Sequence, residues 1–227
     1  MQAKTNLHSG SITRFIKNSM DLQTTIKQGL ALPLMEAFYT VQGEGTHSGT
    51  PAYFIRLGGC DVGCVWCDVK DSWDAGQWPV VDIEEIVAGA MQYPGRMVVI
   101  TGGEPLLYDL FPLTALLKEK GFIIHIETSG AHPFSGHFDW VCFSPKKFKA
   151  PHPSIYTEAD ELKVVIYHKS DFAFAEKHAA LVTPTCKKLL QPEWDKSVLM
   201  LNQVIEYVKN HPNWKISLQT HKFMAIP

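Results

Sequence analysis

The sequence predicts an α/β fold, specifically a partial (incomplete) α/β barrel, and three observations indicate it. Short apolar runs alternate with segments of helical periodicity, which is typical of parallel strands joined by crossover helices. About six or seven such units can be counted, fewer than the eight of a closed barrel. Polar clusters follow most of the apolar runs, and in α/β barrels active sites are built at the carboxyl ends of the strands.

The individual elements follow from this alternation. In chain order the expected strands are Ala52–Leu57, Met97–Thr101, Phe122–Glu127, Trp140–Phe143, Leu162–Ile166, Lys188–Leu190 and Trp214–Leu218. Apolar residues at helical spacing between several of these runs predict helices over Ile83–Met91, Leu110–Lys120, Asp171–His178 and Lys196–Asn210.

We expect one domain at residues 34–227, preceded by an N-terminal extension at residues 1–33. The chain has 227 residues, of which 45% are hydrophobic, so it can bury a sizeable core as a single domain. Residues 1–33 are polar and carry little periodicity, and we therefore expect them to be loosely ordered.

Charge and cysteine content exclude several functional classes. The net charge is −2, from 21 basic and 23 acidic residues without a long basic run, so we expect neither nucleic acid nor an anionic membrane as the main partner. No apolar run approaches the roughly 20 residues of a membrane span, and the N-terminus lacks the apolar region of a signal peptide. The five cysteines are odd in number and three are clustered, which argues against a disulfide framework and suits a reducing cytoplasm.

The three clustered cysteines, Cys60, Cys64 and Cys67, lie in the segment CDVGCVWC. Gly63 permits a tight backbone path that would bring the three sulfurs together. Three thiolates are one fewer than a 4Fe–4S cluster or a closed zinc site takes from protein, and a cluster held in this way keeps one iron free for another ligand. The alternative is a structural zinc site completed by a histidine such as His47.

The spacing CxxxCxxC resembles the cluster motif of the radical S-adenosylmethionine superfamily. The sequence GGEP at Gly102 to Pro105, 35 residues after Cys67, is similar to the second motif of that superfamily. The resemblance implies a partial TIM-type barrel, a 4Fe–4S cluster held by the three cysteines, and bound S-adenosylmethionine.

Polar groups for the cofactor are expected at the rim. Gly102 and Gly103 would let a backbone edge approach the ligand, whereas Glu104 and Pro105 shape a turn that an ordinary helix start would also use. Hydroxyl, amide and ammonium groups are available for the ribose and carboxylate of S-adenosylmethionine. From these groups and the resemblance, the expected cofactor-binding residues are Trp66, Cys67, Asp68, Gly103, Glu104, Ser129, Ser144, Pro145, Lys146, Gln191, Pro192, Glu193 and Trp194.

A longer resemblance concerns the substrate. The segment FYTVQGEG at Phe38–Gly45, the run AYFIRLGGC, and the later sequences ETSG, SPK, LQP and QTHKFMAIP are similar to the 7-carboxy-7-deazaguanine synthase family of queuosine and deazapurine biosynthesis. The resemblance implies contraction of 6-carboxy-5,6,7,8-tetrahydropterin to 7-carboxy-7-deazaguanine with loss of ammonia, aided by Mg²⁺. It also implies a homodimer and an external reductant such as flavodoxin.

Carried over by position, the resemblance implies a set of substrate contacts. Arg56 would pair with the substrate carboxylate through its planar fork, and Glu44 would hydrogen-bond the amino-pyrimidine edge of the pterin. The alternative for Arg56 is a surface salt bridge. The complete expected set is Val41, Gln42, Gly43, Glu44, Arg56, Thr101, His221 and Pro227.

The C-terminal segment is expected to reach the same cleft. Phe223, Met224 and Ile226 would gain from burial, and the carboxylate of Pro227 would accept hydrogen bonds from the pterin. A disordered tail is the alternative.

One position departs from the family pattern. After Cys67 and Asp68 the family usually places a hydroxyl residue that helps to bind Mg²⁺, and this chain has Val69. Magnesium needs oxygen ligands, which an isopropyl group does not supply. The metal would then be bound more weakly, or held by substrate, water and a neighbouring carboxylate or backbone oxygen.

Two other functional classes share part of this pattern. A radical activase that acts on the glycyl site of a partner protein carries the same cluster motif, but the VQGEG segment and Arg56 argue for a small-molecule substrate. A non-enzymatic zinc-binding module would be colourless, whereas an iron–sulfur protein absorbs visible light.

Overall fold

The structure, a computed structural model, describes residues 21–227, so residues 1–20 of the expected extension lie outside the described residues. The strands form one nine-stranded sheet in the order β3-β1-β2-β4-β5-β6-β7-β8-β9. They are β1 (Ala31–Val41), β2 (Pro51–Leu57), β3 (Val80–Asp82), β4 (Met97–Gly102), β5 (Ile123–Thr128), β6 (Trp140–Phe143), β7 (Glu161–Ile166), β8 (Lys187–Pro192) and β9 (Trp214–Ile216).

The strands from β2 through β4 to β9 run parallel and neighbour one another in chain order, whereas β1 pairs antiparallel with both β2 and β3. The sheet has β3 at one edge and β9 at the other, so it does not close on itself. This arrangement confirms the predicted partial barrel. All seven predicted strands and all four predicted helices are present, and their ends differ from the prediction by two residues at most.

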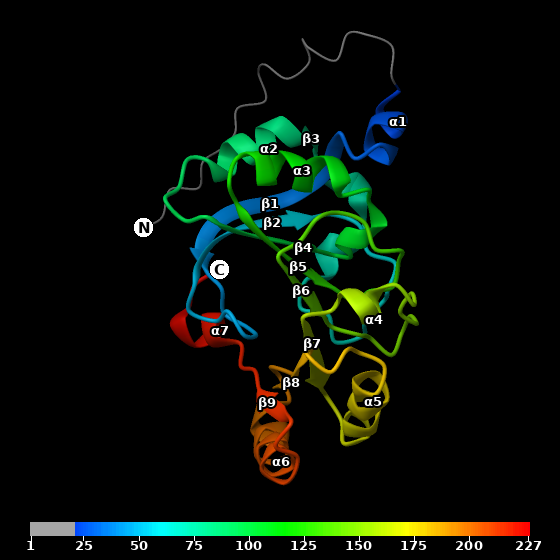
Figure 1. The fold of residues 1–227 in the computed structure, drawn as a ribbon, viewed down its shortest axis with the longest axis vertical. Coiled ribbons are helices and arrows are strands. Elements are labelled where there is room, and N and C mark those ends of the chain that lie inside the picture. The colour runs from blue at the N-terminus through cyan, green and yellow to red at the C-terminus, as the bar shows by residue number, and fades with distance from the viewer. Residues whose placement is uncertain (1–20) are drawn as a thin grey trace.

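Helices follow the outer side of the curved sheet (Figure 1). They are α2 (Ile83–Ala90), α3 (Phe111–Glu119), α4 (Ile155–Glu158), α5 (Ser170–Ala179) and α6 (Ser197–Asn210). A further short helix, α7 (Thr220–Met224), lies on the opposite side, beside the loop that joins β1 to β2 (Figure 1). Among the described residues, no helix is both long and apolar enough to cross a membrane.

Alternation along the strands separates the core from the inside of the barrel. Val98 and Ile100 of β4, with Ile124 and Ile126 of β5, are fully buried in the main core, which the residues of α2 and α3 share. Because successive side chains of a strand point to opposite faces, the residues between them face inward. Polar residues at those inward positions are therefore gathered inside the barrel.

The first strand corrects the expectation for residues 21–33. The structure places a helix, α1 (Leu22–Lys27), and the first residues of β1 there, and Thr25, Ala31 and Leu32 are buried. The pattern was missed because β1 mixes polar and apolar residues and contains Pro33. Its stability comes from pairing with strands on both sides, which is a tertiary effect.

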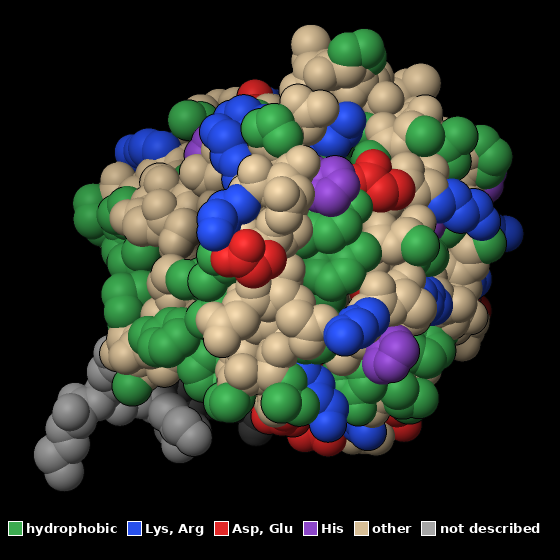
Figure 2. Space-filling view, turned by 90° about the horizontal axis from the view of Figure 1, so that it is seen from below, with side chains coloured by type: hydrophobic (Ala, Val, Ile, Leu, Met, Phe, Trp, Pro, Cys, Tyr) green, Lys and Arg blue, Asp and Glu red, His purple; other side chains and the backbone are tan. Residues whose placement is uncertain are grey.

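Charge on the surface is mixed. On the face shown in Figure 2, lysine and arginine side chains are separated by acidic and neutral ones. This distribution matches the small net charge of −2 and forms no continuous basic surface on that face.

Candidate active site

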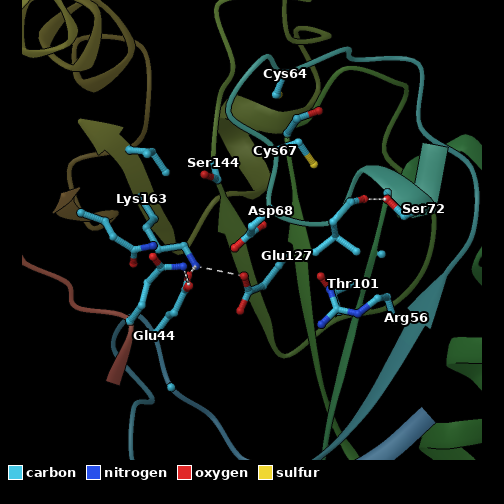
Figure 3. Close-up of a pocket in the computed structure, with 18 of the residues that line it drawn as sticks. Glu44, Arg56, Cys64, Cys67, Asp68, Ser72, Thr101, Glu127, Ser144 and Lys163 are labelled. Atoms are coloured by element: carbon cyan, nitrogen blue, oxygen red, sulfur yellow. Dashed lines mark hydrogen bonds and ion pairs between the residues drawn. The ribbon is translucent and has the colours of Figure 1, made fainter. Parts of the chain in front are cut away.

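A pocket of about 280 Å³ opens at the carboxyl ends of the parallel strands, and residues from β1 to the C-terminal segment line it (Figure 3). Cys64 and Cys67 lie toward one end in that view, and Glu44, Glu127 and Lys163 lie toward the other. The polar clusters that follow separate strands in the sequence thus share one cavity.

The three cysteines of the motif are free thiols that line this pocket. Backbone hydrogen bonds hold the start of their loop: the Gly59 N–H donates to the Ser72 oxygen over 2.6 Å, and the Cys60 N–H to the Trp73 oxygen over 3.1 Å. Burial raises the pKa of Cys60 and raises that of Cys64 to about 11. Binding of iron to the thiolates would therefore displace protons from these groups.

The structure does not bring His47, the histidine expected to complete a zinc site, into the pocket that the cysteines line. The ring of His47 packs instead against His125, at 4.5 Å between centroids, and against Trp140, at 4.6 Å. Three thiols on one loop fit a cluster better, because each thiolate then binds a different iron.

The two glycines of GGEP permit a close approach to the cysteine loop. A Cβ atom on Gly102, which has a φ of +145°, would lie 2.2 Å from the Leu57 oxygen. One on Gly103 would lie 2.2 Å from the Gly59 oxygen and 2.6 Å from the Cβ of Cys60. Glycine is therefore required at both positions for the second motif to lie against the first.

Glu104 lies beneath the pocket and does not line it, contrary to its expected place among the cofactor-binding residues. Its side chain is 1% exposed. It accepts hydrogen bonds from the N–H groups of Leu106 and Ser129 and from the hydroxyls of Thr128 and Ser129. These bonds satisfy both carboxylate oxygens, so Glu104 holds the turn after β4 against the turn after β5. Pro145 and Pro192 are likewise absent from the pocket wall.

The remaining predicted residues line the pocket together. On the cofactor side these are Trp66, Cys67, Asp68, Gly103, Ser129, Ser144, Lys146, Gln191, Glu193 and Trp194. On the substrate side they are Val41, Gln42, Gly43, Glu44, Arg56, Thr101, His221 and Pro227.

Arg56 forms the salt bridge that was the alternative to substrate binding, and it also lines the pocket. Its Nε donates to Glu36 over 2.6 Å, which is the expected salt bridge. The two terminal nitrogens make no hydrogen bond with the described residues, and the side chain lines the pocket beside Thr101 of the neighbouring strand. The guanidinium can therefore present its outer edge to an anion while Glu36 holds its inner edge.

Sequence reasoning missed Lys163 and Glu127 as members of the site. Lys163 is 3% exposed, and its Nζ donates to Glu44 over 2.5 Å and to Glu127 over 2.9 Å (Figure 3). Burial raises the pKa of Glu44, but the charge and hydrogen bond of Lys163 outweigh it and lower that pKa to about 2. The signal in the sequence was a lysine flanked by apolar residues in the strand ELKVVI, where a charge is rarely buried without a partner.

Ser72 and Trp73, just beyond the cysteine loop, were also missed. The hydroxyl of Ser72 donates to the Val69 oxygen over 2.6 Å. The Nε1 of Trp73 is buried and has no hydrogen-bond partner among the described residues, although the residue lines the pocket. A ligand acceptor at that point would satisfy the indole N–H.

The C-terminal segment contacts the pocket, but not through burial of its apolar side chains. Phe223 is 70% exposed and Met224 is 49% exposed, which contradicts the expected burial of both. The segment is held instead by Thr220, whose N–H and hydroxyl both donate to the Gly43 oxygen over 2.8 Å. A Cβ on Gly43 would lie 2.3 Å from the Nδ1 of His221, so the helix and the loop fit only because residue 43 is glycine.

An open barrel with three cysteines after its first parallel strand and a glycine motif after the second defines a radical S-adenosylmethionine enzyme. The model of the radical SAM superfamily matches residues 54–148. The 7-carboxy-7-deazaguanine synthase of Flavobacterium psychrophilum is 52% identical over 207 residues, which cover 91% of this chain and 98% of that protein. The chain belongs to the 7-carboxy-7-deazaguanine synthase family.

Two further relatives agree with this assignment. The 7-carboxy-7-deazaguanine synthase of Escherichia coli is 35% identical over 224 residues, which cover 86% of this chain and 98% of that protein. The crystal structure of QueE from Escherichia coli superposes with a TM-score of 0.77 at 33% identity, covering 89% of this chain and all of that one. These relatives do not favour the alternative of a glycyl-radical activase.

Proposed function

We propose that this chain catalyses the contraction of 6-carboxy-5,6,7,8-tetrahydropterin to 7-carboxy-7-deazaguanine with release of ammonia. One observation carries the proposal beyond the family name. A single pocket has free thiols toward one end and a buried, hydrogen-bonded set of charged groups toward the other. Such a pocket can hold a cluster with S-adenosylmethionine beside a small polar heterocycle.

Cys60, Cys64 and Cys67 would hold the 4Fe–4S cluster, and the amino acid end of S-adenosylmethionine would occupy the remaining iron. When bound, the cluster and S-adenosylmethionine supply one-electron reduction and hydrogen-atom abstraction. The protein binds and orients these groups and excludes water.

Lys146 is suited to the carboxylate of S-adenosylmethionine. Its Nζ donates to the Ser144 hydroxyl over 2.6 Å and lies 5.4 Å from the centre of the Trp66 ring. Burial lowers the pKa of Lys146, and an anion bound beside it would restore the charged form. Ser129, Gln191, Glu193 and Trp194 complete the cofactor wall that we propose.

The opposite wall would orient the pterin. Arg56 is placed to bind the carboxylate with its free terminal nitrogens, and Glu44 to accept from the amino-pyrimidine edge. Gln42 donates to Glu127 over 2.9 Å, which fixes the segment in which Val41, Gly43 and Glu44 lie. Thr101, His221 and Pro227 complete this side.

Magnesium does not fit a preformed donor set here. Val69 supplies no side-chain oxygen, and the carboxylate of Asp68 already meets the Nζ of Lys222 at 3.1 Å. We therefore derive no step through Mg²⁺ and expect a weak dependence on it.

The wider setting of the enzyme belongs to the same proposal. One sheet contains all the described strands, which supports a single radical SAM domain. The five free thiols support a reducing cytoplasm, with flavodoxin or a similar protein as reductant. The exposed Val198 and Leu199 of α6 support a homodimer, because contact with a second copy would cover them.

The test is an anaerobic assay of the reconstituted protein. We expect brown absorbance from the cluster and, with reductant and S-adenosylmethionine, conversion of 6-carboxy-5,6,7,8-tetrahydropterin to 7-carboxy-7-deazaguanine and ammonia. A colourless zinc protein would contradict the cluster. Cleavage of S-adenosylmethionine without any turnover of the pterin would contradict the substrate.

A further inference from the structure

The inner face of β7 holds the loop that joins β1 to β2. Glu161 and Lys163 alternate along this strand and therefore point to the same side. The Glu161 Oε2 accepts from the Thr46 N–H over 2.8 Å, and the Nζ of Lys163 donates to Glu44 over 2.5 Å. We refer to residues 42–46 as the Glu44 loop; its conformation depends on side chains that β7 supplies.

Lys163 also joins this loop to the opposite wall of the barrel. The same Nζ donates to the Glu127 Oε2 over 2.9 Å, and Gln42 of the Glu44 loop donates to the other oxygen of Glu127 over 2.9 Å. One buried ammonium thus fixes two carboxylates that come from segments far apart in the chain. At 3% exposure it has little freedom to move away from them.

The charges around Lys163 do not cancel. The titratable groups that face it are Glu44 from the loop, Glu127 from β5, Cys142 from β6 and Glu161 from β7, and Lys146 lies farther along the pocket. Attraction by the carboxylates outweighs burial and raises the pKa of Lys163, so the ammonium stays charged. Two carboxylates that share one cation leave a surplus negative charge at the pocket wall.

The two carboxylates keep capacity to accept further hydrogen bonds. Each oxygen of a carboxylate can accept about two, and the Oε1 of Glu44 accepts from the Gln219 Nε2 over 2.9 Å. The matching Oε1 of Glu127 receives only Gln42. A ligand edge that carries adjacent N–H donors, such as a 2-aminopyrimidinone, has the chemistry to fill these positions.

We propose that Lys163 is a positioning residue that fixes Glu44 and Glu127 as a pair of acceptors for the amino-pyrimidine edge of the substrate, and thereby sets the preference for a 2-amino pterin. The inference rests on the proposed function. The proposed function leaves open which group holds the recognising carboxylates in place, and Lys163 is that group.

The experiment compares two substrates on four proteins. The substrates are 6-carboxy-5,6,7,8-tetrahydropterin and its analogue without the 2-amino group. The proteins are the reconstituted wild type, Lys163→Arg, Lys163→Met and the double variant Lys163→Met with Glu127→Gln. Lys209→Met, which removes an exposed lysine paired with Glu206, is the matched control. Iron content, thermal midpoint and cleavage of S-adenosylmethionine without pterin are measured on each protein.

In Lys163→Met we expect KM for the pterin to rise at least about tenfold, kcat to change less than about threefold, and discrimination between the two pterins to be lost. Lys163→Arg keeps the charge and donors and should retain most of the discrimination. The double variant removes one carboxylate together with the ammonium, so we expect the thermal midpoint and iron content to recover while discrimination stays lost.

A pH profile separates positioning from simple packing. Without the ammonium, the two carboxylates repel each other, so one of them should bind a proton at higher pH than in the wild type, which moves the acidic limb of kcat/KM to higher pH. If Lys163→Met discriminates between the two pterins as well as the wild type does, or if the double variant regains that discrimination, the inference is wrong while the proposed function still stands. A wild-type protein that cleaves S-adenosylmethionine but never converts the pterin would overturn the proposed function and this inference with it.

Discussion

Gly103 lies directly against Gly59, because a Cβ on Gly103 would be 2.2 Å from the Gly59 carbonyl oxygen. Two backbone hydrogen bonds reinforce the contact: the Gly103 N–H donates to the Leu57 oxygen over 3.0 Å, and the Glu104 N–H to the Gly59 oxygen over 2.9 Å. The end of β4 therefore sets the starting point of the cysteine loop, one residue before Cys60.

This contact predicts that Gly103→Ala displaces the cysteine loop. We expect iron content after reconstitution to fall by at least about half and cleavage of S-adenosylmethionine to fall at least about tenfold, because small misplacements of reacting groups are costly. Gly76→Ala is the control, since a Cβ there meets only the carboxylate of Asp74 at 3.2 Å. Normal iron content in Gly103→Ala would show that the loop adapts.

Each of the three motif cysteines should be indispensable. Cys60→Ala, Cys64→Ala and Cys67→Ala should each abolish cleavage of S-adenosylmethionine and lower bound iron, because the cluster has no spare thiolate. Cys186→Ala is the matched control: that thiol is also buried but lies outside the pocket, so its loss should affect stability alone. Full activity in any motif variant would refute the cluster assignment.

Arg56 should require its guanidinium and not only its charge. Arg56→Lys cannot both hold Glu36 and present two parallel N–H donors, so we expect kcat/KM for the pterin to fall by about tenfold to a hundredfold. Uncoupled cleavage of S-adenosylmethionine should survive. Glu36→Gln separates the two roles, because it weakens the salt bridge and leaves the guanidinium in the pocket. An unchanged kcat/KM in Arg56→Lys would leave the residue with its salt bridge only.

Because Val69 supplies no oxygen, we expect turnover to depend only weakly on the concentration of Mg²⁺. Val69→Thr replaces one methyl group by a hydroxyl of similar size, so we expect the variant to show a steeper Mg²⁺ titration of turnover than the wild type. Val69→Ala controls for the change in packing and should behave like the wild type. Superimposable titration curves for the Thr variant and the wild type would show that this side chain has no part in metal binding.

Two buried histidines predict loss of stability in mild acid. Burial lowers the pKa values of His125 and His178 to about 4, below the ordinary value of 6.5. The stabilisation that comes from keeping these histidines neutral is therefore complete above about pH 6.5. As the pH falls toward 4, the free energy of unfolding decreases by about 1.4 kcal/mol per pH unit for each histidine. The test is denaturant unfolding of the wild type and of His178→Gln at pH 6.5 and 5.5. The glutamine can still bond the Tyr156 hydroxyl but does not titrate, so the free energy of unfolding should fall less between these two pH values, by about the contribution of one histidine. An unchanged slope would contradict the assignment.

Local patterns predicted the parallel part of the fold well. The runs at Val98–Ile100 and Ile124–Ile126 are buried strands because their branched apolar residues have few other stable environments. β1 was not predicted because its stability depends on pairing with two other strands, and such pairing leaves no periodic pattern in the local sequence. The short α7 escaped for a similar reason, since its anchor is the distant Gly43.

The site was predicted where a motif was continuous in sequence and missed where it was assembled in space. The cysteines and glycines act through local backbone geometry, which spacing reveals. Lys163 contacts Glu44 and Glu127, which are more than 30 residues away along the chain, and no local pattern links them. Glu104 is the opposite case. It belongs to a continuous motif and was expected to bind the cofactor, but its carboxylate accepts hydrogen bonds from Leu106 and Ser129 of the same chain.

Because the barrel is not closed, we expect ligands to enter and leave the pocket at the gap between the two edges of the sheet. Among the described strands, no backbone pairing joins β1 or β3 to β9. Across that gap Thr220 donates two hydrogen bonds to the Gly43 oxygen, Ser217 accepts one from the Gly45 N–H, and Gln219 donates one to Glu44. Each of these bonds contributes only about 0.5–1.5 kcal/mol, and they come from a few residues. We therefore expect ligands to enter and leave by local opening of this contact, while the rest of the sheet keeps its register.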